Sequence, residues 1–220
     1  MKILNLHGFM GKADNRTYAA LCELMPKENI VSPKLDYMHT PPDELFCRLS
    51  DIILVEGIDI IIGQSRGGFY ALPLAMKHGI PCILTNPCLL PAETEVIVNS
   101  ELNCDILDEY KDMSKLRYFG KAFILISDND AIIPENFVIC KDISPNIKRV
   151  NGTHSNIIGV KDELSELLKR LEDPKEREVH LMDLIKGIDR IMIVDDARTF
   201  ENSQHNEDDF DTIETEDDEQ

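Results

Sequence analysis

The chain of 220 residues has no pair of cysteines in Cys-x-x-Cys spacing, and its histidines and cysteines form no cluster with the spacing of a zinc site. Two of the six cysteines, Cys22 and Cys82, lie in apolar segments. We therefore expect free, buried thiols in a protein from a reducing compartment, and we predict neither a metal nor another cofactor. The six are Cys22, Cys47, Cys82, Cys88, Cys104 and Cys140.

Long apolar runs are also missing. None approaches the 18 residues that would indicate a membrane-spanning helix, so no membrane partner is expected. The first predicted strand begins at Lys2, which leaves no room for a signal peptide before it. These two features predict a cytoplasmic protein.

Basic residues are scarce: 23 lysines and arginines stand against 41 acidic residues, and the net charge is −18. Such a charge disfavours nucleic acids and anionic membranes as partners. The segment from Asp195 to Gln220 contains 12 acidic residues and one basic residue, so it carries −11 and leaves −7 for the rest. We predict that residues 195–220 form a disordered acidic tail.

Apolar strand-like segments alternate with amphipathic helical segments over most of the chain. This alternation predicts an α/β protein, a three-layer α/β/α sandwich around a mostly parallel six-stranded sheet. The domain is expected to span residues 1–171. The predicted strands are 2–6, 29–32, 58–63, 81–85, 122–127 and 147–150, and the predicted helices are 14–25, 42–55, 67–78, 104–117, 134–141 and 155–171.

Residues 172–194 have a different character. Apolar residues at helical spacing form one stripe, which either packs back on the domain or docks a protein partner. The segment from Arg190 to Val194 also fits a strand. The stripe consists of Leu181, Leu184, Ile185, Ile188 and Met192.

The segment Gly63-Gln64-Ser65-Arg66-Gly67 directly follows a buried apolar run. Its form is that of a nucleophile elbow, in which a strand turns sharply into a helix and exposes a serine. Glycines on both sides allow the backbone to crowd there, and the helix start directs free N–H groups at an oxyanion. A glycine-rich turn with a structural serine is the alternative.

A nucleophilic serine needs a histidine as base and an acid that orients it. His154 lies in the turn-rich loop Asn151–Ser155, between a predicted strand and the last predicted helix, and we select it as the base. His180 is held in reserve. The other four histidines either precede Ser65, lie on the helix after it or lie in the tail: His7, His39, His78 and His205.

The acid is expected just after the strand 122–127, where two aspartates compete. Asp130 precedes two branched aliphatic residues and a proline, and we prefer it. Asp128 is the alternative, although it fits a turn-capping role. Both aspartates could also simply form turns.

The turn His7-Gly8-Phe9 follows the first predicted strand. Such a His-Gly-X turn supplies the second donor of an oxyanion hole in lipases and esterases. The backbone N–H groups of Phe9 and Arg66 are therefore our candidate donors. His7 is predicted to be structural and to fix the loop by a hydrogen bond.

Together these segments resemble the α/β-hydrolase superfamily, and most closely the small lidless YqiA-type bacterial esterases, over residues 1–171. The resemblance implies the strand order 2-1-3-4-5-6 and hydrolysis of short acyl esters through an acyl-serine, without a cofactor. The residues that carry it are Leu6–Phe9, Gly63–Ala71, Asn86-Pro87, Asp130 and Gly152–His154.

Arg66 departs from the small or apolar residue expected after the serine. Its side chain either selects an anionic substrate or pairs with a nearby carboxylate, and we favour the pairing. The stretch 86–121 is the only place for a lid, and because it is short and charged we expect an open, shallow site.

The sequence thus predicts a serine hydrolase of small-molecule carboxylic esters or thioesters, with Ser65, Asp130 and His154 as the catalytic residues. Acyl transfer or lyase chemistry on the same residues stays open. A non-catalytic hydrolase-fold scaffold, which recruits a partner through its C-terminal extension, is the alternative function.

Overall fold

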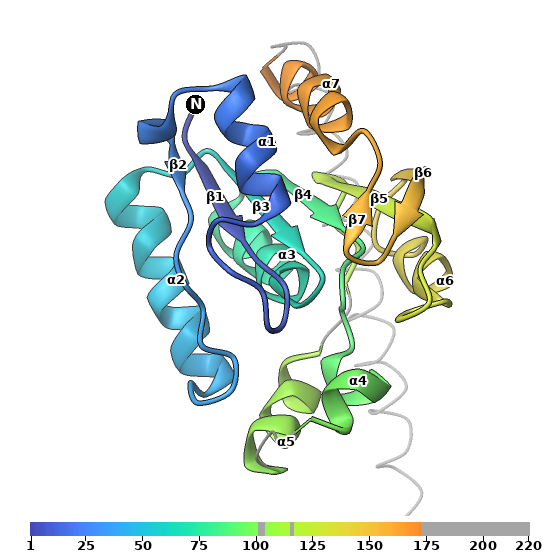
Figure 1. The fold of residues 1–220 in the computed structure, drawn as a ribbon. Coiled ribbons are helices and arrows are strands. Elements are labelled where there is room, and N and C mark those ends of the chain that lie inside the picture. Colours follow the sequence, from blue (N-terminus) through green and yellow to red (C-terminus); the bar gives the residue numbers. More distant parts are fainter. Residues whose placement is uncertain (101–103, 115–116, 173–220) are drawn as a thin grey trace, which may run out of the picture.

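A computed structural model describes residues 1–100, 104–114 and 117–172 of the chain. Its centre is one seven-stranded sheet in the order β2-β1-β3-β4-β5-β6-β7 (Figure 1). All neighbouring strands pair in parallel except β6 and β7. The strands are β1 (Ile3–Leu6), β2 (Ile30–Val31), β3 (Ile60–Gln64), β4 (Cys82–Thr85), β5 (Ala122–Asn129), β6 (Asn146–Thr153) and β7 (Asn156–Ile157).

Helices cover both faces of this sheet. Side chains of α1 and α7 pack on one face, and side chains of α2, α3, α5 and α6 pack on the other. The α-helices are α1 (Arg16–Leu24), α2 (Pro42–Glu56), α3 (Arg66–His78), α4 (Glu95–Val98), α5 (Cys104–Met113), α6 (Asn136–Cys140) and α7 (Val160–Glu172), and two 3-10 helices are η1 (Lys27–Asn29) and η2 (Pro91–Glu93).

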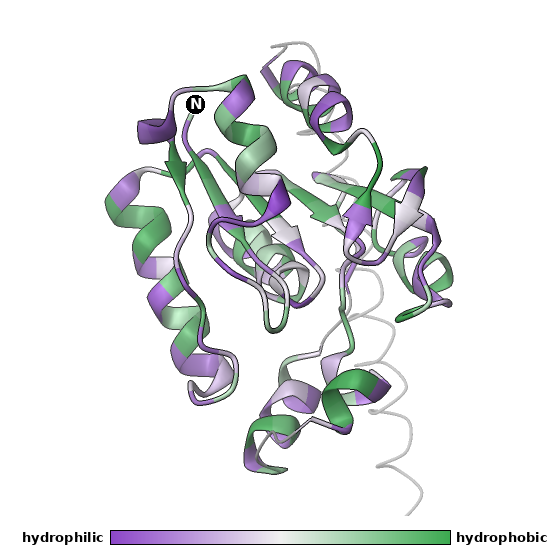
Figure 2. Cartoon of the chain, in the orientation of Figure 1, coloured by the Kyte–Doolittle hydropathy of each residue, from purple (hydrophilic) through white to green (hydrophobic). Residues whose placement is uncertain are grey.

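The protein has one hydrophobic core on each face of the sheet, because successive side chains of a strand point to opposite faces. In β3, Ile60 and Ile62 belong to the core under α1 and α7, whereas Ile61 belongs to the core under α2 and α3. The central strands are hydrophobic along their length, while the helices carry hydrophilic residues on their outer sides (Figure 2). A strand buried on both faces reads as the continuous apolar run seen in the sequence.

The predicted three-layer α/β/α architecture and the strand order 2-1-3-4-5-6 are confirmed, with one additional strand. β7 is a two-residue antiparallel strand that pairs with the end of β6. It occupies residues that we predicted as the start of the last helix, which begins at Val160 instead of Ser155. Gly152 permits the tight hairpin, since a Cβ there would lie 2.2 Å from the carbonyl oxygen of Asn156.

Two further boundaries move toward the carboxyl ends of the strands. β5 continues to Asn129, and β6 continues to Thr153, so each strand ends directly before a predicted site residue. The helix predicted for 104–117 ends at Met113. The extension 172–194, apart from Glu172, and the acidic tail lie outside the described residues, as does His180.

The expectation of buried cysteines holds for only part of the set. All six thiols are free; Cys82, Cys88 and Cys140 are buried, and Cys22 is half-buried. Cys47 and Cys104 are exposed, because they lie on the outer sides of α2 and α5. Among the described residues, no helix is both long and apolar enough to cross a bilayer.

Candidate active site

Ser65 occupies the sharp turn between β3 and α3. Its backbone has φ 50° and ψ −119°, a region that residues with a side chain rarely adopt. The glycines make this turn sterically possible. A Cβ at Gly67 would lie 2.3 Å from the carbonyl oxygen of Leu6, and one at Gly63 would lie 2.6 Å from the carbonyl oxygen of Gly67. The structure therefore has the elbow that the pentapeptide predicts.

The backbone of Ser65 is tied to the next strand. Its N–H donates to the carbonyl of Thr85 at 3.0 Å, and its own carbonyl accepts from the N–H of Cys88 at 2.9 Å. Because α3 begins at Arg66, the first N–H groups of that helix have no partner within the helix. Such groups favour negative charge beside Ser65.

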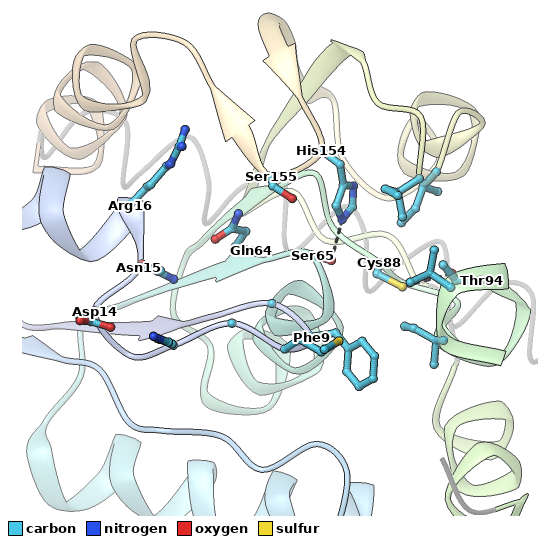
Figure 3. Close-up of a pocket in the computed structure, with 18 residues that line it drawn as sticks. Phe9, Asp14, Asn15, Arg16, Gln64, Ser65, Cys88, Thr94, His154 and Ser155 are labelled. Carbon is cyan, nitrogen blue, oxygen red and sulfur yellow. Dashed lines mark hydrogen bonds between the residues drawn. The ribbon is translucent and has the colours of Figure 1, made fainter. Parts of the chain in front are cut away.

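His154 follows β6 and faces Ser65. The hydroxyl of Ser65 is 2.8 Å from Nε2 of His154, the contact drawn as a dashed line in Figure 3. On the other side of the ring, Nδ1 of His154 donates to the carboxylate of Asp130 and lies 2.8 and 3.0 Å from its two oxygens. The three side chains thus form one continuous series of hydrogen bonds.

Asp130, rather than Asp128, contacts the histidine. Burial raises the pKa of the Asp130 carboxyl, but the hydrogen bond from His154 and the N–H groups of Ile133 and Ile132 outweigh burial, and the net pKa lies below its ordinary value. Asp128 is exposed and lies 3.9 Å from Arg149. The carboxylate at position 130 is therefore the one that can orient His154.

Asn86 holds the loop that carries His154. Its side-chain amide donates to the carbonyls of Thr153 and His154 at 3.1 and 2.9 Å and to the hydroxyl of Ser127 at 2.9 Å. Its side-chain oxygen accepts from the N–H of Ser127 at 2.7 Å. The sequence analysis missed this role. The available signal was an asparagine directly after a predicted strand, since asparagine adopts positive φ more readily than most residues, and Asn86 has φ 43°.

The loop after β1 lies against the elbow. A Cβ at Gly8 would lie 3.0 Å from Cβ of Ser65, which shows how closely the two backbones approach. His7 fixes this loop: Nε2 accepts from the N–H of Leu35 at 2.9 Å, and Nδ1 donates to the carbonyl of Gly8 at 2.8 Å. Burial lowers the pKa of His7, so the ring is a neutral acceptor. His7 is therefore structural in its contacts, as predicted.

The predicted pairing of Arg66 with a carboxylate is wrong for the described part of the chain. The side chain is fully buried, and none of its three guanidinium nitrogens has a hydrogen-bond partner there. Aromatic rings surround it instead, with Cζ 4.8, 5.1 and 4.2 Å from the ring centres of Phe9, Tyr37 and Tyr110. Burial raises the pKa of the Tyr110 hydroxyl, and the positive charge of the neighbouring Arg66 opposes that effect.

A pocket of about 620 Å³ opens at Ser65 and His154. Figure 3 shows Phe9, Cys88 and Thr94 on one side of the serine and Asp14, Asn15 and Arg16 on the other. The first side is mainly apolar and the second polar. Thr94, which lies between η2 and α4, and Val96 and Ile97 of α4 extend the wall. The stretch that we considered for a lid therefore flanks the pocket. Sequence patterns gave no signal for these lining residues.

Two other histidines lie apart from this pocket. His78 contacts the hydroxyl of Ser50 at 2.8 Å, and His39 contacts Asp36 at 2.9 Å. Cys88 lines the pocket, but burial raises the pKa of its thiol to about 11, so it stays protonated near neutral pH. Among the described residues, no group of histidine, cysteine, aspartate or glutamate side chains could hold a metal ion.

Solved structures with the same fold include hydrolases and thioesterases. A putative hydrolase from Agrobacterium vitis S4 is 10% identical with a TM-score of 0.60, over 78% of this chain and 88% of that chain. The type II thioesterase BorB from the borrelidin biosynthetic cluster is 14% identical with a TM-score of 0.55, over 77% and 90%. A putative YdeN-like hydrolase from Pectobacterium atrosepticum is 15% identical with a TM-score of 0.54, over 77% and 91%.

At these identities the likeness concerns the fold, and it confirms the α/β-hydrolase architecture expected from the sequence. Residues 2–133, more than half of the chain, match the model of a family described as Uncharacterised protein family (UPF0227). This match includes Ser65 and Asp130 and ends before His154. The chain is therefore a member of the UPF0227 family, and it has the fold of α/β hydrolases.

Proposed function

We propose that the protein hydrolyses carboxylic esters or thioesters of short acyl groups through an acyl-serine intermediate. The observation that carries this proposal is the continuous series of hydrogen bonds from Ser65 through His154 to Asp130, at the edge of an open pocket. A serine hydroxyl becomes nucleophilic when a positioned base takes its proton, and His154, whose Nε2 lies 2.8 Å from Oγ of Ser65, would be that base.

In the first half of the reaction, Oγ of Ser65 attacks the acyl carbon while its proton passes to Nε2 of His154. Asp130 holds Nδ1–H and stabilises the imidazolium that forms. The carbonyl oxygen becomes an oxyanion, which the backbone N–H groups of Phe9 and Arg66 would bind. Loss of one such donor typically costs about 3–4 kcal/mol in activation free energy.

The intermediate then expels the alcohol or thiol, which takes the proton from His154, and the acyl group remains on Ser65. In the second half, water attacks the acyl carbon while His154 takes one of its protons. The second tetrahedral intermediate releases the carboxylic acid and returns the proton to Oγ of Ser65. All groups that move protons are then restored.

The two sides of the pocket suggest how an ester would lie. The apolar side, with Phe9, Cys88 and Ile133, would receive the acyl group, because burial of its methylene groups contributes about 0.8 kcal/mol each. The polar side, with Asn15 and Arg16, would face the alcohol or thiol.

A panel of p-nitrophenyl esters with acyl chains of two to twelve carbons tests this function on the full chain. We expect turnover that is highest for the short chains and absent in Ser65→Ala, which should melt at the temperature of the wild type. Undiminished turnover in Ser65→Ala would overturn the assignment. A folded wild type without any turnover of esters or thioesters would favour the non-catalytic scaffold.

We also propose that residues 1–172 suffice for the chemistry, since α7 completes one of the two cores. A chain that ends at Glu172 should keep the kcat of the full chain. A partner bound by the extension would be lost in the same variant, which separates catalysis from recruitment. A large loss of kcat would show instead that the extension takes part in the site.

A further inference from the structure

The buried charge of Arg66 has no evident structural benefit. Its side chain has no exposed surface, and no carboxylate or other hydrogen-bond partner meets its nitrogens in the described residues. Removing a charged group from water is costly unless it is paired, and ring contacts offset only part of that cost. Such a residue opposes folding, and its contacts indicate a role in the site instead.

Those contacts lead to the proposed oxyanion hole. The guanidinium packs on the ring of Phe9, whose backbone N–H is the second candidate donor. It also packs on the ring of Tyr37, whose hydroxyl donates to the carbonyl of His7 at 2.5 Å and so fastens the same loop. The backbone N–H of Arg66 is the first candidate donor. The one side chain therefore connects the two backbone segments that would bind the oxyanion.

The guanidinium does not contact the pocket itself. Phe9 and Cys88 line the pocket, and Arg66 lies behind them. Its positive charge nevertheless reaches the wall, because it lowers the pKa of the Cys88 thiol against the larger effect of burial. A substrate anion would thus have no direct access to Arg66, whereas its electric field extends through a medium of low dielectric constant.

We propose that the Arg66 side chain is a positioning residue of the oxyanion hole. It fastens the Phe9 loop and places a positive charge, which no carboxylate of the described residues pairs, behind the forming oxyanion. This inference rests on the function proposed above. The charge interacts with the tetrahedral intermediate more strongly than with the neutral ester, so it lowers the barrier without tightening substrate binding.

The first test is Arg66→Met, which removes the charge and fills most of the volume while the backbone N–H remains. We expect kcat on a neutral p-nitrophenyl ester to fall roughly 10- to 100-fold, less than the 10²- to 10³-fold loss typical of a missing donor. KM should stay within about twofold. The unfolding midpoint should equal or exceed that of the wild type, because a buried unpaired charge has been removed.

Arg170→Met is the matched control. Its guanidinium also lies over a ring, 5.2 Å from the centre of Phe123, but on α7 and away from the pocket. We expect this variant to keep the kcat and KM of the wild type. A loss of kcat in Arg66→Met but not in Arg170→Met would therefore be due to the charge behind the pocket, and not to the loss of a guanidinium–ring contact in general.

Arg66→Lys provides a readout that a purely structural role would not change. An ammonium in this apolar cage has a lowered pKa, unlike a guanidinium. The ratio of its kcat to that of the wild type should therefore be highest at low pH and fall toward the Arg66→Met level as the pH rises. The same ratio for Arg66→Met should not vary with pH.

Three results would overturn the inference while the wild type still hydrolyses esters. These are an unchanged kcat in Arg66→Met, a loss confined to KM, and a ratio for Arg66→Lys that is independent of pH. If Arg66→Met does not fold, the pH dependence of Arg66→Lys decides alone. A wild type that hydrolyses no ester would instead overturn the proposed function, so the two failures are distinguishable.

Discussion

The turn of Ser65 and the loop of His154 achieve precise placement in different ways. The elbow depends on backbone contacts between neighbours, where Gly67 lies against the backbone of Leu6 and leaves no room for a Cβ. The His154 loop depends on the side chain of Asn86, which contacts the backbone of Thr153 and His154 from 67 and 68 positions away.

This difference decides how each region responds to change. Where two backbone segments are in contact without free space, an added side-chain atom displaces both segments and disturbs the sheet around them. A side-chain tether can be lost while the fold persists, so that mainly the position of His154 is affected. The elbow should therefore be sensitive in stability, and the histidine loop should be sensitive in turnover.

The largest expected effect lies on the histidine side. Asp130→Asn should lower kcat by about 10⁴-fold, because an amide no longer holds His154 in the tautomer that accepts a proton at Nε2. Asp128→Asn is the matched control, since that carboxylate is exposed and faces Arg149. Steady-state hydrolysis of one ester by both variants checks this prediction. Equal losses in the two variants would show that the acid is misassigned.

The next effect concerns the elbow. Gly67→Ala should lower the free energy of unfolding by roughly 3 kcal/mol or more, as the new Cβ would overlap the carbonyl oxygen of Leu6. Gly79→Ala adds a Cβ where nothing lies within 4 Å, and its φ of 66° alone should cost about 1–2 kcal/mol. Urea unfolding of both variants gives the comparison. Similar losses would mean that crowding at the elbow is not what fixes the turn.

A third variant breaks the tether of the histidine loop. Asn86→Gly removes the side chain and still tolerates φ 43°, so it deletes the contacts with Thr153, His154 and Ser127 without adding strain. We expect a loss of about 1–3 kcal/mol in stability and a fall in kcat of at least tenfold. A stable variant with full kcat would show that β6 alone positions His154.

The smallest effect is a pH dependence of stability from His7. Its pKa is lowered by burial, so the unfolded chain takes up a proton near pH 6.5 that the folded chain does not. Stability should therefore fall as the pH drops below 6.5, by at most about 1.4 kcal/mol per pH unit. His7→Gln should reduce this slope, and the lowered pKa of His78, which is also due to burial, accounts for a remaining part. Urea unfolding between pH 8 and pH 5 measures the slope in both proteins. An unchanged slope would assign it to another group.

Asp130 does not interfere in that range. Its folded-state pKa is lowered, so its contribution to stability is complete above its ordinary value of 3.8 and is lost only as the pH falls further. The difference between the wild type and His7→Gln above pH 5 is then due to His7.

The features that the sequence could predict are those encoded by neighbouring residues. The glycines beside Ser65 and the apolar run before it define the elbow, and the alternation of strands and helices defines the sheet. The order of Ser65, Asp130 and His154 along the chain selected side chains that the structure brings within hydrogen-bonding distance.

Features that depend on distant contacts were missed or wrong. The Asn86 side chain donates to the carbonyl of His154, which is far away in the sequence, and no local pattern reveals such a partner. The expected pairing of Arg66 with a carboxylate was wrong. The cage of Phe9, Tyr37 and Tyr110 forms only when three separate segments fold together, so no local pattern reveals it. The start of α7 moved from Ser155 to Val160, since pairing with β6 outweighs the helical pattern of the hairpin residues.

The most direct test of the central claim is reaction of the full chain with a fluorophosphonate, followed by identification of the modified residue by mass spectrometry. The account predicts a single adduct on Ser65, with a rate of labelling that falls strongly in Asp130→Asn and is unchanged in Asp128→Asn. An adduct on another residue, or no adduct on the folded wild type, would contradict the claim that His154 and Asp130 activate Ser65.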